Sequence, residues 1–255
     1  MIVVPFHQDT ALPEGTLPVP AGVTVATDLP AGDRWPRLVA LWDAVAATVA
    51  ADPAPVVVSG DCLVALGVVA GVQRAGADPA IVWFDAHGDV HTLESSTSGY
   101  LGGLALRLVL GAHADRVAEP LGLRPIPERR AVLVDARDLD PAEADYLAAS
   151  DLRHCPVTDV EPPDGPLVLH VDVDVIDSAE LPGLLFPAPD GPSTATVVTA
   201  VRRIVATGRV AALSIACPWH PTPTEGRRDL IEALAMRFGV AGGPTVDHPD
   251  RGGTP

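Results

Sequence analysis

Short continuous runs of apolar residues, rich in valine, isoleucine and leucine, recur along the chain and constrain its fold more than any other feature. Each run ends in a loop that is rich in polar residues, aspartate or glycine. The runs cover residues 2–5, 56–58, 80–84, 131–134, 167–173 and 211–215. Because apolar and polar residues do not alternate within them, these runs are typical of strands buried on both faces, as in a parallel sheet.

Helix-like stretches separate these runs. In residues 35–49, Leu38, Leu41 and Val45 recur at helical spacing. Residues 141–149 begin with a proline directly after Asp140, which is a favourable start for a helix. The other expected helices cover residues 62–75, 193–206 and 225–238. The alternation of strands and helices predicts an α/β fold, specifically a three-layer α/β/α sandwich with a mostly parallel sheet.

The length of the chain bears on its domain organisation. A chain of 255 residues suits one large α/β domain with a well-buried core. We expect that domain to cover residues 1–241, followed by a flexible C-terminal tail of residues 242–255 that is rich in glycine, proline and aspartate. The proline-rich residues 12–20 are expected to form a surface loop.

Composition limits the partners of the chain. Its formal net charge of -16 disfavours nucleic acid and anionic membranes and is compatible with a small cationic ligand. No apolar run is long enough to span a bilayer, and the first residues lack the pattern of a signal peptide, so we expect a cytoplasmic protein. The cysteines Cys62, Cys155 and Cys217 form neither a disulfide framework nor a CxxC zinc pattern.

Residues that can bind a metal follow three of the apolar runs. They are Asp61 and Cys62 after residues 56–58, Asp85, His87 and Asp89 after residues 80–84, and Asp172 and Asp174 in and after residues 167–173. In open parallel sheets, ligands bind beyond the carboxyl ends of the strands. The sequence therefore predicts that these side chains meet at one edge of the sheet.

Asp172 and Asp174 are the most informative pair. A spacing of two within a strand puts both carboxylates on the same side, and buried carboxylates are costly unless they are paired or bind a metal. Asp85 and His87 repeat this spacing at another strand end. Turn-forming aspartate is the alternative for either pair alone, but the two pairs together favour a metal site. Carboxylates with one imidazole suit divalent ions such as Mn²⁺, and two such ions can activate a water between them.

Four stretches of the sequence resemble one known family. Residues 85–89 (DAHGD) and 170–177 (HVDVDVID) resemble the two signature stretches of the arginases, agmatinases and formimidoylglutamases. Residues 59–62 (SGDC) resemble that family's Gly-Gly-Asp-His stretch, and residues 97–103 (TSGYLGG) resemble its substrate loop Thr-Ser-Gly-Asn-Leu-His-Gly. The order and spacing match from about residue 55 to residue 221. The resemblance implies an arginase-like fold, a homo-oligomer and a metal-dependent hydrolase.

The resemblance also implies the reaction and the residues that serve it. The reaction is cleavage of a linear C–N bond in a guanidino, amidino or formimino compound, which releases an amine together with urea or an amide. The implied metal ligands are Cys62, Asp85, His87, Asp89, Asp172 and Asp174, with Asp85 and Asp172 bridging two manganese ions. The implied catalytic residues are Asp89 and His91, and the implied substrate contacts are His91, Ser96, Ser98 and His220.

Cys62 departs from the pattern, because the family has a histidine ligand at this position. A thiolate would favour a softer ion such as Zn²⁺ or leave a single ion bound. The start of a helix lowers the pKa of a thiol, which supports a ligand role. The alternative is a small buried residue with a weak or empty first metal site.

Three further departures fall on implied functional positions. His91 takes the place of an asparagine, Gly102 that of a proton-shuttling histidine, and Pro218 that of the glutamate that pairs with a guanidinium. A guanidinium in a closed pocket needs an anionic partner, so Pro218 argues against plain L-arginine and favours an N-substituted guanidine whose cation is weaker.

Two alternatives to this enzyme remain open at the level of sequence. One is a catalytically silent relative that keeps the fold and a partial metal site. The other is a deacetylase-like amide hydrolase of the same fold. Outside the motifs, Trp219 is expected to pack in the core and Arg137 to form a structural ion pair. His7 and Asp9 follow the first strand and could face the site, but a solvated loop is the favoured expectation for both.

Overall fold

The computed structural model describes residues 1–19, 22–221 and 226–235. Its centre is an eight-stranded sheet in which all neighbouring strands are parallel. In spatial order the strands are β4 (Val23–Thr24), β1 (Ile2–Val4), β5 (Val56–Ser59), β10 (Val210–Ala216), β9 (Leu167–Asp172), β6 (Ala80–Asp85), β7 (Ala131–Asp135) and β8 (Arg153–Cys155). A separate antiparallel hairpin joins β2 (Phe6–His7) and β3 (Thr10–Ala11). The predicted α/β fold with a parallel sheet is confirmed.

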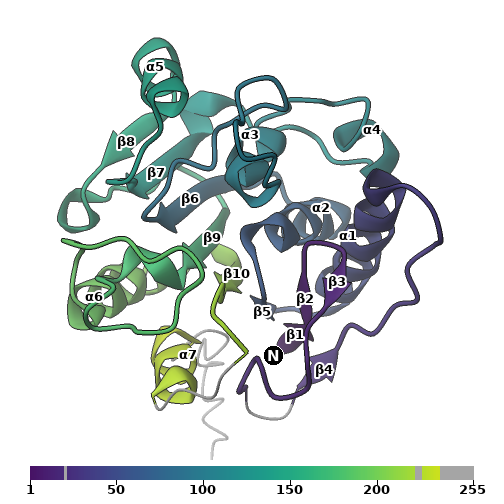
Figure 1. Ribbon diagram of the computed structural model, residues 1–255, viewed down its shortest axis with the longest axis horizontal. Coiled ribbons are helices and arrows are strands. Elements are labelled where there is room, and N and C mark those ends of the chain that lie inside the picture. Colours follow the sequence, from purple (N-terminus) through teal and green to yellow (C-terminus); the bar gives the residue numbers. More distant parts are fainter. Residues whose placement is uncertain (20–21, 222–225, 236–255) are drawn as a thin grey trace, which may run out of the picture.

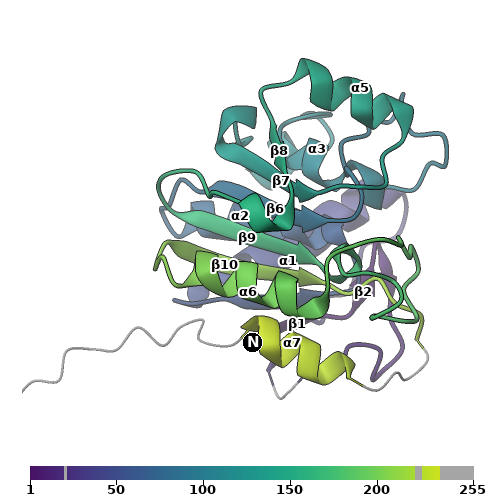
Figure 2. The same cartoon turned by 90° about the vertical axis from the view of Figure 1, so that its left-hand side faces the viewer.

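Helices cover both faces of the sheet and complete three layers (Figures 1 and 2). One face packs against α1 (Arg34–Ala51), α2 (Ala65–Arg74), α3 (Ala105–Val109), α4 (Ala118–Leu121) and α5 (Pro141–Ala149). The opposite face packs against α6 (Thr194–Val205) and α7 (Arg227–Ala235). None of the described helices has the length and apolar composition needed to cross a bilayer.

The central strand β6 shows why its sequence is continuously apolar. Ile81 and Trp83 point into the hydrophobic cluster under α1 and α2, whereas Val82 and Phe84 point into the cluster under α6 and α7. Side chains alternate between the faces of a strand, so a strand covered on both faces needs apolar residues at every position. Polarity returns only at Asp85, where the strand ends.

The helix starts follow from local hydrogen bonds. The side chain of Asp61 accepts a hydrogen bond from the Leu63 amide (2.9 Å) at the start of the 3₁₀ turn η1 (Cys62–Val64), which precedes α2. The Glu143 carboxylate accepts from the Asp140 amide (3.1 Å) at the start of α5. These bonds satisfy amides that have no partner within a helix.

Several boundaries differ from the sequence-based expectations. The helix expected over residues 62–75 begins with the 3₁₀ turn and becomes an α-helix only at Ala65. Residues 12–20 are not simply a surface loop, because Thr16 and Leu17 are buried. The expected helix end at residues 236–238 and the expected tail at residues 242–255 lie outside the described residues.

Candidate functional site

The carboxyl ends of β6 and β9, which are neighbours in the sheet, place the acidic residues of the site. Each strand ends on an aspartate, Asp85 or Asp172. Asp174 does not lie in the strand as the sequence predicted, because β9 ends at Asp172 and a 3₁₀ turn, η5 (Val173–Val175), follows. The Asp172 carboxylate accepts a hydrogen bond from the Asp174 amide (2.9 Å). This local bond turns the chain and keeps the two side chains at the same edge of the sheet.

The end of β6 is built in the same way. The Asp85 carboxylate accepts a hydrogen bond from the His87 amide (2.8 Å), two residues further on. The Asp174 carboxylate accepts from the Ala86 amide (3.2 Å), which joins the two strand ends. Asp85 also accepts from the indole nitrogen of Trp83 (3.1 Å). The site is therefore held by short backbone contacts rather than by long flexible side chains.

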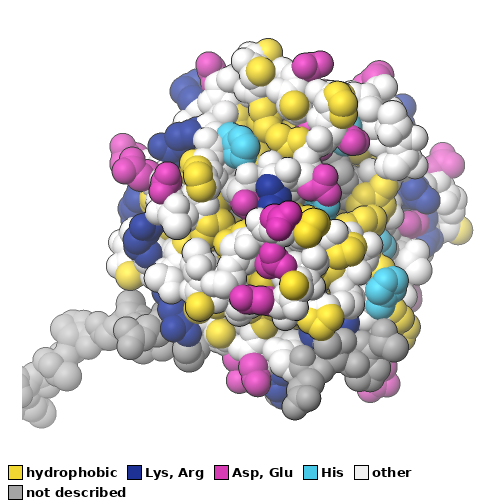
Figure 3. Space-filling model, turned by 60° about the vertical axis from the view of Figure 1, so that its left-hand side comes forward, with side chains coloured by type: hydrophobic (Ala, Val, Ile, Leu, Met, Phe, Trp, Pro, Cys, Tyr) yellow, Lys and Arg dark blue, Asp and Glu magenta, His cyan; other side chains and the backbone are white. Residues whose placement is uncertain are grey.

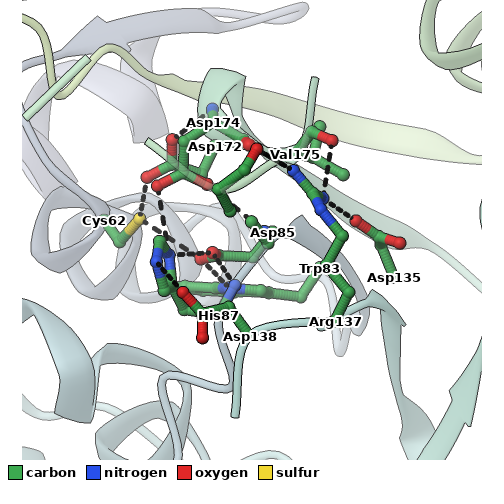
Figure 4. A network of polar contacts seen from close by, with 12 residues as sticks. Cys62, Trp83, Asp85, His87, Asp135, Arg137, Asp138, Asp172, Asp174 and Val175 are labelled. Carbon is green, nitrogen blue, oxygen red and sulfur yellow. Dashed lines mark hydrogen bonds and ion pairs between the residues drawn. The ribbon is translucent and has the colours of Figure 1, made fainter. Parts of the chain in front are cut away.

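Of the three groups of potential ligand atoms among the described residues, one joins His91, Asp140 and Glu143, and the other two share Asp85 (Figure 4). In the first group, Cys62 Sγ lies 2.8 Å from Asp172 Oδ2 and 3.8 Å from Asp85 Oδ2. In the second, His87 Nδ1 lies 3.3 Å from Asp85 Oδ1 and 3.2 Å from Asp174 Oδ2. Within each group the ligand atoms lie within 4.8 Å of one another, as a bound ion requires.

Asp89 lies beside these groups in an unusual environment. Its backbone has a positive φ of 53°, and its side chain is buried. Within the described part of the chain, its Oδ2 atom has no hydrogen-bond partner. A buried carboxylate oxygen without a donor is costly, so a cation at this point is the natural partner for it.

Burial and mutual repulsion dominate the electrostatics of the carboxylates. Burial raises the pKa of Asp89 and Asp172 well above the ordinary value, and neighbouring aspartates raise it further. The pKa of Asp174 rises to about 6 for the same reasons. Burial also opposes ionisation of Asp85, but the hydrogen bonds and charge of His87 lower its pKa. A divalent cation would remove this repulsion, so the donor set fits a metal.

His87 is the positive partner of the site when no metal is present. Burial alone would lower the pKa of its imidazole, yet hydrogen bonds and charges from Asp174 and Asp85 raise the pKa to about 12. The imidazole therefore carries a proton where a metal ligand needs a lone pair. Metal binding at this residue would release that proton.

The expectation that a helix start would lower the pKa of Cys62 is wrong. Cys62 opens a 3₁₀ turn rather than an α-helix, and burial raises the pKa of its thiol, with further increases from Asp172, Asp89 and Asp85. In this state the thiol donates a hydrogen bond to Asp172. Only a cation close to the sulfur would offset the surrounding negative charge and favour the thiolate.

A cavity of about 320 Å³ opens above these groups. All of the predicted metal ligands line it, as do His91, Ser96 and Ser98. Asp61 also lines it, as its place after a strand predicted, whereas the sequence-based reasoning missed other lining residues, among them Tyr100, Asp138, Asp140, Glu143 and Phe186. Tyr100 lies within the TSGYLGG stretch, so its position in that loop was the one signal available for it.

Comparison with known proteins gives the family. The model of the arginase family matches residues 14–217. The chain belongs to the arginase family. It is 30% identical over 192 residues to the arginase of Eremothecium gossypii, covering 68% of this chain and 48% of that protein. It is 31% identical over 161 residues to the N(omega)-hydroxy-L-arginine amidinohydrolase of Streptomyces lavendulae, covering 60% of this chain and 57% of that protein. The chain thus spans about half the length of these curated relatives.

Solved structures of arginase-family proteins share the fold. The arginase from Bacillus cereus superposes with a TM-score of 0.76 at 20% identity, covering 92% of this chain and 94% of that one. The proclavaminate amidino hydrolase from Streptomyces clavuligerus superposes with a TM-score of 0.63 at 18% identity, covering 91% and 87%. At these identities the likeness concerns the fold alone.

His91, which departs from the arginase-family pattern, lines the cavity. Its side chain is buried, with Nδ1 3.0 Å from Ser95 Oγ and Nε2 3.1 Å from Asp140 Oδ2. Both ring nitrogens are therefore engaged. A substrate contact by His91 would have to replace one of these two bonds.

His220 does not lie where the sequence predicted. It is exposed and is not among the residues that line the cavity. Its amide donates to the Gly183 carbonyl (2.9 Å), which fixes the backbone so that the side chain faces outward. The neighbouring Trp219 is buried, as expected, and its indole donates to the Thr16 carbonyl (2.9 Å).

Two further expectations concerned loop residues near the strand ends. Arg137 forms the expected structural ion pair with Asp135 and also donates to the Ala188 carbonyl (2.8 Å). Asp9 pairs with Arg37 (2.8 Å) and not with the cavity. Neither residue lines the cavity, so both serve the scaffold around it.

Proposed function

We propose that this chain is a metal-dependent hydrolase that cleaves a linear C–N bond in a guanidino, amidino or formimino compound, releasing an amine together with urea or an amide. The observation that carries this proposal is the pair of ligand groups that share Asp85 at the floor of a cavity. A sequence relative named for amidine chemistry, the N(omega)-hydroxy-L-arginine amidinohydrolase of Streptomyces lavendulae, supports it.

The residues that would hold the ions follow from the two groups. Cys62, Asp85 and Asp172 would hold the first ion, and Asp85, His87 and Asp174 the second. The family resemblance adds Asp89 to the residues that would hold the first ion and Asp172 to those that would hold the second. We expect manganese, with zinc or a single ion as the alternative that the Cys62 thiol favours. Bound ions of this kind supply electrophilic polarisation and an activated water.

The charges around the cavity favour a small cationic substrate. Acidic side chains line it, among them the exposed Asp138 and Asp140 and the buried Glu143, whereas no arginine of the described residues does. A cavity lined in this way attracts cations and repels carboxylates. On the face seen in Figure 3, acidic side chains near the centre lie among hydrophobic side chains and beside a basic one. We therefore expect an amidine or guanidine without a free carboxylate near its reacting end.

Pro218 restricts the class of substrate further. It lines the cavity, has no acceptor on its side chain, and its carbonyl already accepts the Leu185 amide (2.6 Å). A strongly charged guanidinium such as the alkylguanidinium of L-arginine would lack a carboxylate partner at this position. This supports an amidine, or a guanidine whose N-substituent weakens its cation, and it argues against plain L-arginine.

A catalytically silent relative is the second candidate. The observation that favours it is the Cys62 thiol, which donates a hydrogen bond to Asp172. As a metal ligand, the sulfur would instead have to lose this hydrogen and bind the cation. A protein with a weak first site would hold one ion at the group formed by Asp85, His87 and Asp174.

The test is product release from a panel of compounds by the chain loaded with Mn²⁺. The panel contains alkylguanidines, amidines, formimino amino acids and acetylated amines, and the measured products are urea, ammonia, formamide and acetate. Amidine or guanidine hydrolysis with two ions bound supports the proposal. Acetate release alone would instead indicate a deacetylase, and one ion with no turnover would indicate the silent relative. Sedimentation of the same sample tests the expected homo-oligomer.

A further inference from the structure

The Tyr100 ring occupies the space in front of Gly102. A Cβ atom added at Gly102 would lie 2.6 Å from Tyr100 Cζ and 2.7 Å from its hydroxyl oxygen, distances that real contacts do not reach. Positions 100 and 102 therefore cannot both carry a side chain in this arrangement. The phenol oxygen stands where a side chain of residue 102 would begin, on the wall of the cavity.

His7 holds the Tyr100 hydroxyl in this place. The two rings are stacked, with centroids 5.7 Å apart and planes at 21°. His7 Nδ1 lies 3.2 Å from the Gly60 carbonyl, which can only accept, so Nδ1 carries the hydrogen. In the neutral imidazole Nε2 then has the lone pair, and the Tyr100 hydroxyl donates to it across 3.4 Å. His7 was expected in a solvated loop, and the structure instead packs it against the cavity wall.

The tautomer of His7 decides which hydrogen-bonding capacity remains free at Tyr100. With the imidazole hydrogen on Nδ1 and Nε2 unprotonated, the Tyr100 hydroxyl is the donor of this contact, and the lone pairs of its oxygen are available to accept. Within the described part of the chain, His7 is the one hydrogen-bond partner of this hydroxyl. Burial raises the pKa of Tyr100, and the acidic groups around it raise this pKa further, which favours the neutral phenol.

Few neutral acceptors stand beside Tyr100 among the described lining residues. The Ser96 and Ser98 hydroxyl oxygens each already accept a backbone amide, from Gly99 (3.2 Å) and from Tyr100 (3.2 Å). Gly102 has no side chain, and the Pro218 carbonyl is engaged by the Leu185 amide. Phe186 packs against Tyr100 with ring centroids 4.8 Å apart and offers no hydrogen bond. The Tyr100 oxygen, with its free lone pairs, is thus a polar group of the cavity wall next to the aromatic ring of Phe186.

We propose that the Tyr100 hydroxyl, held by His7 over Gly102, accepts a hydrogen bond from a cationic N–H group of the amidine or guanidine substrate and so selects cations that carry N–H donors. This inference rests on the proposed function for the identity of the substrate. His7 acts as a positioning residue, because it directs the phenol hydrogen away from the ligand.

The test measures binding of two cations of similar shape by calorimetry, with the Mn²⁺-loaded protein. Butylguanidinium carries N–H donors, whereas butyltrimethylammonium has none. Tyr100→Phe keeps the ring and its packing but removes the oxygen. Because hydrogen bonds to charged groups contribute about 1.5–3 kcal/mol, we expect affinity for butylguanidinium to fall roughly 10-fold to 100-fold. Affinity for butyltrimethylammonium should not change.

Tyr146→Phe is the matched control, since the Tyr146 hydroxyl donates to Glu128 (2.5 Å) and does not line the cavity. Melting temperature and metal content are measured for each variant.

An equal loss of affinity for both cations, no loss for either, or no binding of butylguanidinium by the unmodified protein would overturn the inference. Urea release from butylguanidine is measured in parallel. If Tyr100→Phe selectively loses affinity for butylguanidinium but the unmodified protein hydrolyses no butylguanidine, the proposed function alone is refuted. If the unmodified protein hydrolyses butylguanidine and Tyr100→Phe changes neither this hydrolysis nor the binding, the present inference alone is refuted.

Discussion

At the scale of single residues, Cys62 decides what kind of metal site this chain can form. Its sulfur is buried against Asp172 and Asp85, and its thiol donates a hydrogen bond to the first of them. Every neighbouring carboxylate opposes loss of its proton. The thiol therefore becomes a ligand only if a cation displaces its proton, which makes occupancy of the first site depend on the softness of the ion.

Cys62→His tests this dependence. If the sulfur is a ligand, an imidazole in its place should shift the preference of the site from Zn²⁺ toward Mn²⁺, because imidazole and carboxylate oxygens accept the harder ion readily. Competition titrations with the two ions measure the shift. A purely structural Cys62 would respond otherwise, with destabilisation of about 1–3 kcal/mol from overpacking and no change in selectivity. Cys155→His, at a cysteine on β8 outside the cavity, is the control.

At the scale of elements, α5 supports the loop that carries the ligands after β6. The buried Glu143 carboxylate accepts hydrogen bonds from the Asp140 amide (3.1 Å) and from the Val90 amide (3.3 Å). Val90 directly follows Asp89, so the start of α5 and the ligand loop share one carboxylate. A rigid support of this kind keeps ligands in place before a metal arrives.

Glu143→Ala should destabilise the fold by about 1–3 kcal/mol, because two amides lose a buried acceptor. It should also weaken metal binding, since the backbone beside Asp89 is no longer held. Thermal melts with and without Mn²⁺ measure both effects. Glu119→Ala provides the comparison, because Glu119 is an exposed glutamate in the first turn of α4. A variant at Glu143 that melts and binds metal as the unmodified protein does would contradict this role.

Elements also explain what the sequence could and could not predict. Asp85 and Asp172 were found because a buried strand that ends on aspartate is a local pattern. Tyr100 was missed as a site residue because its place depends on His7, 93 residues away in the chain, and on the missing side chain at Gly102. His220 was placed wrongly because a backbone bond to Gly183 decides its direction, and no motif encodes that bond.

At the scale of the whole molecule, the metal site gathers negative charge in an already acidic protein. The chain has a formal net charge of -16, and the carboxylates that meet at the edge of the sheet are buried. Without a cation, burial and mutual repulsion oppose ionisation of Asp89, Asp172 and Asp174. The fold therefore holds a repulsive cluster that a divalent ion would stabilise.

Removal of metal should for this reason lower the melting temperature of the protein. An ion present at about 100 times its Kd stabilises the folded state by about 2.7 kcal/mol, provided that the unfolded chain does not bind it. Calorimetric melts of the protein loaded with Mn²⁺ and of the same sample after chelation measure the difference, with metal content checked in both.

Asp172→Ala supplies the decisive comparison. This carboxylate lies within the first ligand group and beside the second, so its loss should abolish metal binding and make the melting temperature independent of the chelator. If the unmodified protein melted at the same temperature with and without bound metal, or if Asp172→Ala kept its full metal content, the site would not be the metal centre that its geometry indicates.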